Sequence, residues 1–120
     1  HLRAVDREFL HSLPSLVCLV TLAPEIEGAA EATAALTARG ITVSMGHTRA
    51  SSLEFTCAQS SGATMVTHLF NAMSGVHHRE GGVALWALTD PNLVVGLIAD
   101  GIHVHPAEPR TIRLSAKMLF

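Results

Sequence analysis

Short apolar segments alternate with helix-forming segments along the chain, and this alternation is the feature that most limits its possible folds. The apolar runs are rich in Val, Ile, Leu and Met at consecutive positions, so both of their faces are expected to be buried. The expected strands are 17–22, 41–45, 63–67 and 93–99, and the expected helices are 27–39, 51–60, 83–88 and 106–117. Strands of this kind joined through helices predict a parallel sheet, and therefore the α/β class.

Two of these units resemble each other in outline. The stretches GITVSMGH (40–47) and GATMVTH (62–68) both open with a glycine that follows a helix, and both close with a histidine. The repeat therefore places an imidazole at the same point of two consecutive strand-helix units.

Two architectures fit this order of elements, an open doubly wound sheet and part of a (β/α)8 barrel. A doubly wound nucleotide-binding sheet usually carries a glycine-rich phosphate loop after its first strand, but Ala23, Pro24 and Glu25 follow the first strand here. The sequence favours the TIM-type barrel. A whole barrel takes about 250 residues, so about four units in 120 residues predict a partial barrel domain (1–120) with N-terminal and C-terminal portions outside it.

Composition narrows the class of partner. The formal net charge is -2 and the basic residues are scattered, which argues against binding of nucleic acid or an anionic membrane and for a small-molecule partner. No apolar run reaches the roughly 18 residues of a membrane span. Cys18 and Cys57 lie in apolar segments without paired spacing, and we expect them to be reduced packing residues of a cytoplasmic protein.

Histidines follow three of the expected strands. His47, His68 and His103 come at or soon after strand ends, and the carboxyl ends of parallel barrel strands meet at one mouth. A single histidine at such a place is more often solvated or satisfied than a ligand. Its recurrence in consecutive units favours a metal site formed by His47 and His68. His103 and His105 lie on one face if their segment is extended, whereas His105 alone could cap the following helix.

The segment HHREGG (77–82) places an arginine beside histidines and glycines. A guanidinium offers a planar fork of donors and glycine lets the backbone approach, so Arg79 fits a phosphate or oxyanion clamp. The residues fit a solvated loop with a polar tip equally well.

Several motifs together carry a resemblance to a known family. They are VTLAPE (20–25), SMGHT (44–48), THLFNAM (67–73), HHREGG (77–82) and ADGIHVHP (99–106). With these motifs in order and in register over nearly the whole chain, the sequence resembles the N-acetylglucosamine-6-phosphate deacetylases, (β/α)8 enzymes of the amidohydrolase superfamily.

The resemblance implies roles for six residues and one cofactor. It implies that His47 and His68 bind a divalent metal, zinc first and iron as the alternative. Asn71 and Ala72 match positions that contact the sugar phosphate, and His103 matches a histidine near the acetamide that would stabilise the oxyanion. The family also uses the residue matching Arg79 to bind phosphate in the neighbouring subunit's site, which implies a homodimer.

Two family elements fall outside the sequence. The metal-binding glutamate of a His-Leu-Glu-Gly-Pro stretch would lie upstream of His1, and the catalytic aspartate would lie beyond Phe120. Glu25 is at a strand end, but the family does not use that position as its first ligand. We therefore expect a segment of 120 residues alone to be nearly inactive.

The expected reaction is hydrolysis of N-acetylglucosamine 6-phosphate to glucosamine 6-phosphate and acetate in amino-sugar catabolism. One alternative is another amidohydrolase, dihydroorotase-like or deaminase-like. Such barrels commonly bridge two metals through a carboxylated lysine, and the single lysine, Lys117, is not at an expected strand end. The other alternative is a non-catalytic metal-binding or assembly module on the same scaffold.

Overall fold

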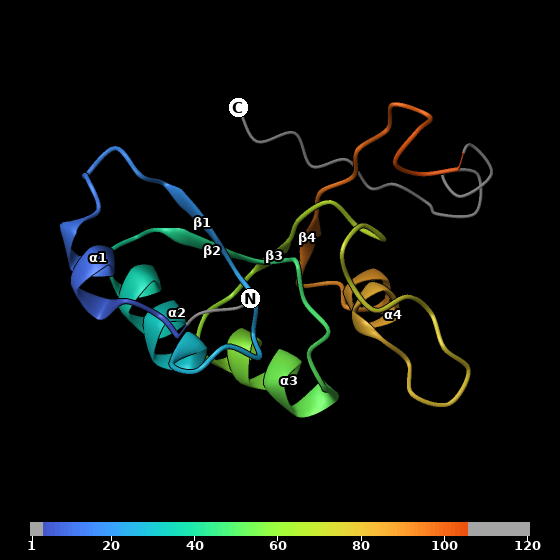
Figure 1. Ribbon diagram of the computed structural model, residues 1–120, viewed down its shortest axis with the longest axis horizontal. Helices are drawn as coiled ribbons and strands as arrows, with labels where there is room; N and C mark the ends of the chain where they lie inside the picture. The colour runs from blue at the N-terminus through green and yellow to red at the C-terminus, as the bar shows by residue number, and fades with distance from the viewer. Residues whose placement is uncertain (1–3, 106–120) are drawn as a thin grey trace.

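The computed structural model describes residues 4–105, which form a four-stranded parallel sheet with helices beside it (Figure 1). The strands are β1 (Leu19–Leu22), β2 (Thr42–Met45), β3 (Met65–Val66) and β4 (Val94–Val95). The helices are α1 (Arg7–Ser12), α2 (Ala29–Ala38), α3 (Ser52–Ser60) and α4 (Val83–Thr89). Within these residues, no helix is long and apolar enough to cross a membrane.

The order of the strands separates the two architectures that the sequence left. Each strand pairs in parallel with its predecessor, giving the order β1-β2-β3-β4. A doubly wound sheet reverses its strand order at a switch point, and the described sheet has no such reversal. The expected α/β class is therefore confirmed, and the strand order is that of successive units in a barrel.

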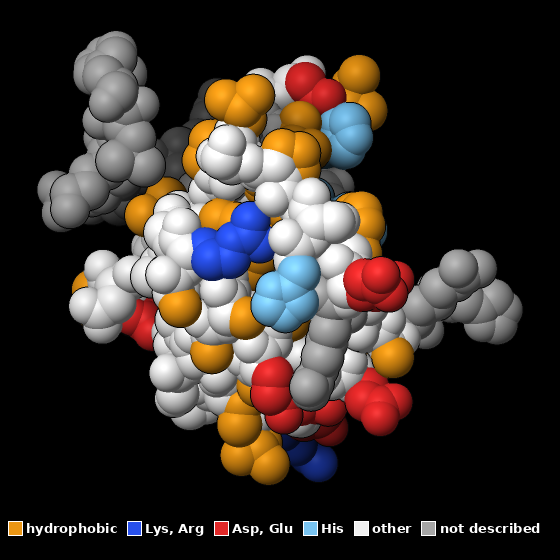
Figure 2. Space-filling model, turned by 90° about the vertical axis from the view of Figure 1, so that its left-hand side faces the viewer, with side chains coloured by type: hydrophobic (Ala, Val, Ile, Leu, Met, Phe, Trp, Pro, Cys, Tyr) orange, Lys and Arg blue, Asp and Glu red, His pale blue; other side chains and the backbone are white. Residues whose placement is uncertain are grey.

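Charged side chains are dispersed over the face that contains α1. In Figure 2, Lys and Arg side chains occupy small separate areas of this face, and several Asp and Glu side chains lie near its lower edge. The described residues on this face thus form no continuous basic surface.

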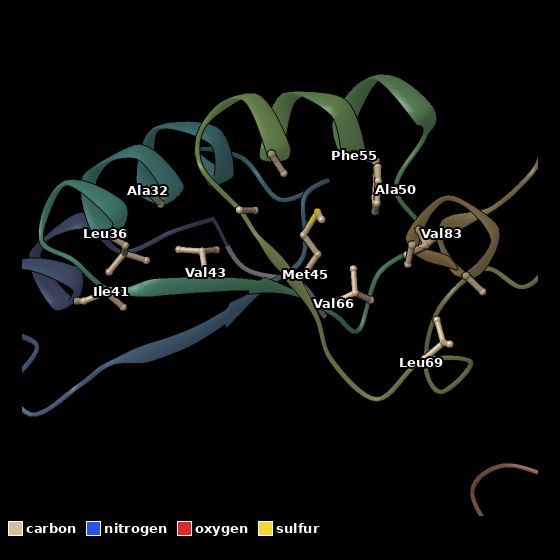
Figure 3. Packing of buried hydrophobic residues seen from close by; sticks show 14 of the residues in the cluster. Ala32, Leu36, Ile41, Val43, Met45, Ala50, Phe55, Val66, Leu69 and Val83 are labelled. Carbon is tan, nitrogen blue, oxygen red and sulfur yellow. The ribbon is translucent and has the colours of Figure 1, made fainter. Parts of the chain in front are cut away.

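The core lies between the sheet and its helices. In-register parallel partners point to the same face, so Val43, Met45 and Val66 all face the helices. They pack against side chains such as Leu36 of α2 and Phe55 of α3 (Figure 3). These five side chains are at most 4% exposed, so this layer provides the main hydrophobic stabilisation of the described part.

The other face of the sheet carries no helix in the described part. Leu19, Thr21 and Val94 point to this face and are exposed, whereas Ser44 at its centre is buried. In a barrel this face lines the interior, which explains why it combines apolar and small polar side chains.

Local signals in the sequence explain where the helices begin and end. Ser51 and Glu54 form a capping box at the start of α3, with Ser51 Oγ accepting from the Glu54 amide and the Glu54 carboxylate accepting from the Ser51 amide. Gly40 and Gly62, the glycines of the repeat, follow α2 and α3 with φ angles of 76° and 111°. Residues with a side chain rarely adopt such angles, so glycine is required at both turns.

Three expectations differ from the structure or lie beyond it. Helix α1 was not expected, although Asp6, whose carboxylate accepts from the Phe9 amide, is a recognisable N-cap. The predicted strands 63–67 and 93–99 are limited to Met65–Val66 and Val94–Val95, which pair with each other. The predicted helix 106–117 lies outside the described residues.

The expectation for the cysteines was half right. Cys18 and Cys57 are both free, as expected, but their side chains are exposed and do not pack in the core. Cys18 precedes β1, and Cys57 lies on the outer side of α3. Both cysteines have apolar neighbours in the sequence, but neither side chain is buried.

Candidate metal and substrate site at the strand ends

The imidazoles of His47 and His68 meet at the carboxyl ends of β2 and β3. His47 Nδ1 lies 3.0 Å from His68 Nε2, and the two rings are nearly perpendicular, at 88°. Two nitrogens bound to one tetrahedral zinc ion, each at 2.0–2.1 Å, lie about 3.3 Å apart. The observed spacing is close to that value, so the two side chains are placed to share one ion.

The backbone at these histidines is strained. His47 and His68 have φ angles of 50° and 38°, and the nearby Phe70 and Ala72 have angles of 72° and 51°. Among the described residues, these are the non-glycine residues in the left-handed region. Each such residue costs of order 1–3 kcal/mol and persists only where the surrounding structure holds it, most often at functional sites. The strain therefore marks this edge of the sheet as a candidate site.

Binding of one shared ion would determine which ring nitrogens of His47 and His68 carry a proton. Both facing nitrogens must be unprotonated to bind it, which leaves the proton of a neutral His68 on Nδ1. That Nδ1 is buried and has no hydrogen-bond partner among the described residues. Imidazole is a preferred ligand for zinc and iron, so the donors present fit the implied metal.

Two histidines are not a complete metal site. Within residues 4–105, no group of three or more His, Cys, Asp or Glu side chains is placed to hold an ion. Glu25 does not complete such a group. Its Oε1 accepts from the Arg49 amide at 2.8 Å, and its Oε2 accepts from the Thr48 hydroxyl. Glu25 thus holds the loop after β2.

Asn71 and Ala72 continue the loop that leaves His68. The Asn71 amide donates to the His68 carbonyl at 2.9 Å, and its side-chain Nδ2 donates to the Leu69 carbonyl at 3.2 Å. The Ala72 carbonyl accepts from the Thr48 amide at 2.9 Å. These contacts place both predicted substrate-binding residues next to the histidine pair, at the ends of the same two strands.

Arg79 lies apart from that edge, near the tip of a hairpin. His77 and Gly81 pair through two backbone hydrogen bonds of 2.7 and 2.9 Å, and the hairpin projects beside α4 (Figure 1). The Arg79 side chain is exposed, and its Nε donates to His78 at 3.2 Å. Together with Arg49 it lines a cleft of about 830 Å³ between this hairpin and the start of α3.

His103 is oriented by an aspartate that the sequence reasoning missed. Asp100 Oδ2 lies 2.7 Å from His103 Nδ1, and Asp100 Oδ1 accepts from the amides of Ile102 and His103. An ionised carboxylate only accepts, so Nδ1 carries the proton. Backbone hydrogen bonds from His103 and Ile102, the first being the larger cause, lower the pKa of Asp100 to about 2.

The segment around His103 is not extended. It runs through consecutive bends, so the condition under which His103 and His105 would lie on one face is not met. An Asp three positions before the histidine was the available signal, since Asp at the start of a turn often binds the following amides.

The fold and the site together define a class. A parallel sheet in sequential order, with strained histidines at two neighbouring strand ends, is part of a (β/α)8 barrel that carries a candidate ion site.

Curated relatives identify the group that the chain resembles. It is 49% identical over 100 residues to N-acetylglucosamine-6-phosphate deacetylase of Rattus norvegicus, covering 78% of this chain and 24% of the relative. It is 47% identical over 105 residues to the Bacillus subtilis deacetylase, covering 88% of this chain and 25% of the relative. The chain thus spans about a quarter of the length of these relatives. No family model matches the chain.

Solved structures agree with the sequence matches. N-acetylglucosamine-6-phosphate deacetylase of Pasteurella multocida matches with a TM-score of 0.81 at 34% identity, covering 91% of this chain and 29% of that one. The Mycobacterium smegmatis deacetylase, a variant solved with N-acetyl-D-glucosamine-6-phosphate, matches with a TM-score of 0.77 at 43% identity over 82% of this chain and 26% of that one. The predicted resemblance and the barrel fold are confirmed.

Proposed function

We propose that this chain is part of a divalent-metal-dependent hydrolase that removes the acetyl group from N-acetylglucosamine 6-phosphate, giving glucosamine 6-phosphate and acetate. The observation that carries the proposal is the 3.0 Å approach of His47 Nδ1 to His68 Nε2 at two neighbouring strand ends. The similarity to deacetylases named for this substrate supports the choice of reaction. The free cysteines support a cytoplasmic location.

His47 and His68 would hold the ion, with zinc or iron as the candidates. When bound, the ion would supply Lewis-acid polarisation of the amide carbonyl and activation of water. Because residues 4–105 hold no group of three metal ligands, the proposal requires a third ligand from outside them. The resemblance implies that the general base, an aspartate, also lies outside them.

The remaining residues would bind and orient the substrate. Asn71 and Ala72 lie beside His68 and would contact the sugar phosphate, and Arg79 would bind the phosphate through its guanidinium fork. His103 would stabilise the oxyanion through Nε2, because Asp100 holds Nδ1. Nε2 can donate to an oxyanion only when it also carries a proton, so this role requires the imidazolium form of His103.

The projecting hairpin supports a further part of the proposal. Arg79 lies exposed on it and, among the described residues, its side chain hydrogen-bonds to the neighbouring His78, so it is well placed to reach a second copy of the chain. We therefore expect a homodimer in which Arg79 of one subunit completes the site of the other.

The reaction is tested with the purified protein that contains this chain. We expect about one or two bound divalent ions per subunit by mass spectrometry and release of acetate from N-acetylglucosamine 6-phosphate. His47→Ala and His68→Ala should lose both, whereas His11→Ala, at an exposed histidine of α1, should keep both. Bound metal without acetate release would favour the non-catalytic module, and turnover of a different amide would favour another amidohydrolase.

The dimer is tested by mixing two inactive variants. Arg79→Ala lacks the arginine, and His68→Ala lacks a metal ligand. In a mixed dimer, the subunit with an intact His68 can receive an arginine only from its partner. The mixed dimer therefore has one intact site only if the arginine acts across the interface. Random mixing of equal amounts should then restore about a quarter of the activity. No recovery in a mixture shown to exchange subunits would refute the shared site.

A further inference from the structure

Thr48 joins the three loops that follow β1, β2 and β3. Its hydroxyl donates to Oε2 of Glu25 in the loop after β1 and accepts from the Ala50 amide at 2.9 Å. The same carboxylate accepts from the Arg49 amide through Oε1 at 2.8 Å. Thr48 is 1% exposed, so its hydroxyl and its bond with the Ala50 amide are buried, whereas the bond between Arg49 and Glu25 is exposed. Glu25 therefore fixes two consecutive residues directly after His47.

The backbone of Thr48 extends the connection to the loop after β3. Its amide donates to the Ala72 carbonyl at 2.9 Å, its carbonyl accepts from the Ser74 amide at 3.3 Å, and it forms a parallel bridge with Met73. Through these bonds Thr48 ties the end of β2 to the loop that begins at His68.

The residues tied in this way include those with strained backbones. His47 precedes Thr48 in sequence, and Ala72 bonds to it directly; both have left-handed φ angles, near 50°. A strained conformation persists only where several contacts hold it. The hydrogen bonds of Thr48 and Glu25 are the contacts that flank His47 on its C-terminal side.

The chemistry of Glu25 also separates this role from that of a ligand. Both carboxylate oxygens already accept hydrogen bonds from Thr48 and Arg49, and the side chain is only partly exposed. A carboxylate has two equivalent oxygens, so one can accept from a hydroxyl while the other accepts from an amide. An amide or hydroxyl side chain has a single oxygen and cannot make both bonds in this way.

We propose that Thr48, held by Glu25, is a positioning residue that keeps the imidazoles of His47 and His68 close enough to share one ion. The inference rests on the proposed metal site. Under this proposal Glu25 and Thr48 support the metal site without contacting the ion or the substrate.

Cobalt binding tests the inference directly, because Co²⁺ bound by imidazoles gives visible absorption bands. The protein containing this chain is stripped of metal and titrated with Co²⁺. Thr48→Val keeps the shape of the side chain and loses the hydroxyl, and we expect it to weaken Co²⁺ binding by about tenfold or more, as for other residues that support ligands. Thr48→Ser keeps the hydroxyl and should restore binding to near that of the unsubstituted protein.

A matched control removes the general effect of the substitution. Thr42 is exposed at the start of β2, the strand that precedes Thr48, so Thr42→Val makes the same chemical change at the opposite end of that strand, away from the site. It should bind Co²⁺ as the unsubstituted protein does. Glu25→Ala provides a second variant that removes the acceptor and leaves Thr48 in place, and it should weaken binding as Thr48→Val does.

The possible failures are distinguishable. If Thr48→Val and Glu25→Ala bind Co²⁺ normally, the positioning role is wrong and the metal site stands. If the unsubstituted protein gives no cobalt bands, the proposed metal site is wrong. A crystal structure of metal-free Thr48→Val then decides the geometry: widening of the 3.0 Å distance between the imidazole nitrogens supports positioning, and an unchanged distance overturns it.

Discussion

Replacement of Gly46 by alanine should damage both the packing and the histidine pair. Gly46 is buried and lies between the last residue of β2, Met45, and His47. A Cβ atom built there would lie 2.5 Å from Thr67 Cγ2, 3.0 Å from Thr21 Cγ2 and 3.5 Å from His68 Cε1. Carbon atoms pack at about 3.5–4.0 Å. To accommodate the added methyl group, Thr67 must move away by roughly 1 Å or more. Thr67 is the residue directly before His68.

The expected cost follows from these distances. Overpacking a well-packed site costs about 1–3 kcal/mol, and the 2.5 Å contact places this substitution toward the upper part of that range. A loss of this size lowers the folding equilibrium constant by about 5-fold to 150-fold, since 1.4 kcal/mol is tenfold. Movement of Thr67 would also shift His68 away from His47, so divalent ion affinity should fall as well.

Urea denaturation measures the loss of stability. The single tryptophan, Trp86, packs against Phe55 with ring centroids 5.4 Å apart and serves as the fluorescence probe. Thr67→Ser removes the Cγ2 atom that the new methyl group meets first. The double variant Gly46→Ala/Thr67→Ser should therefore regain at least part of the free energy of unfolding that Gly46→Ala loses, although the contact with Thr21 remains.

A matched control is available at Gly75, where a Cβ would meet no atom within 4 Å. Gly75→Ala should leave the free energy of unfolding within about 0.5 kcal/mol of the unsubstituted protein. If Gly46→Ala is equally mild, or if Thr67→Ser fails to offset any of its cost, the steric reasoning at this strand end is refuted.

Three further substitutions test other parts of the structure. Ser51→Ala removes the capping box of α3 and should lower the free energy of unfolding by about 1 kcal/mol, whereas Ser60→Ala at the other end should cost less; equal effects in urea denaturation would contradict the cap. Leu36→Ala opens the core at a side chain that is 1% exposed and should cost about 2–5 kcal/mol by the same assay; a loss well under 1 kcal/mol would show that the site is not packed as described. Because the pKa of Asp100 is lowered to about 2 from 3.8 in the folded state, its contribution to stability is present above about pH 4 and is lost as the pH falls toward 2. Carboxyl NMR should show that midpoint, Asp100→Asn should remove this pH dependence, and a midpoint near 3.8 would contradict the contact with His103.

Several features of the fold could be read from the sequence because they depend on local chemistry. Glycines at 40 and 62 end helices since they alone adopt positive φ angles without cost, and Ser51 with Glu54 forms a capping box through contacts three residues apart. The repeat of strand, glycine and histidine likewise follows from positions in the chain. Helix α1 has such a local signal in Asp6, which was overlooked.

The choice between barrel and doubly wound sheet needed the tertiary structure, since strand order is set by pairing between distant segments. The same holds for the contacts that orient the site residues. The sequence named His47 and His68, but their 3.0 Å approach depends on the register that pairs β2 with β3 and on strained backbones after both strands. It gave no sign that Glu25 binds Thr48, because a hydrogen bond between residues 23 positions apart depends on how the strands pack, not on the identity of either residue.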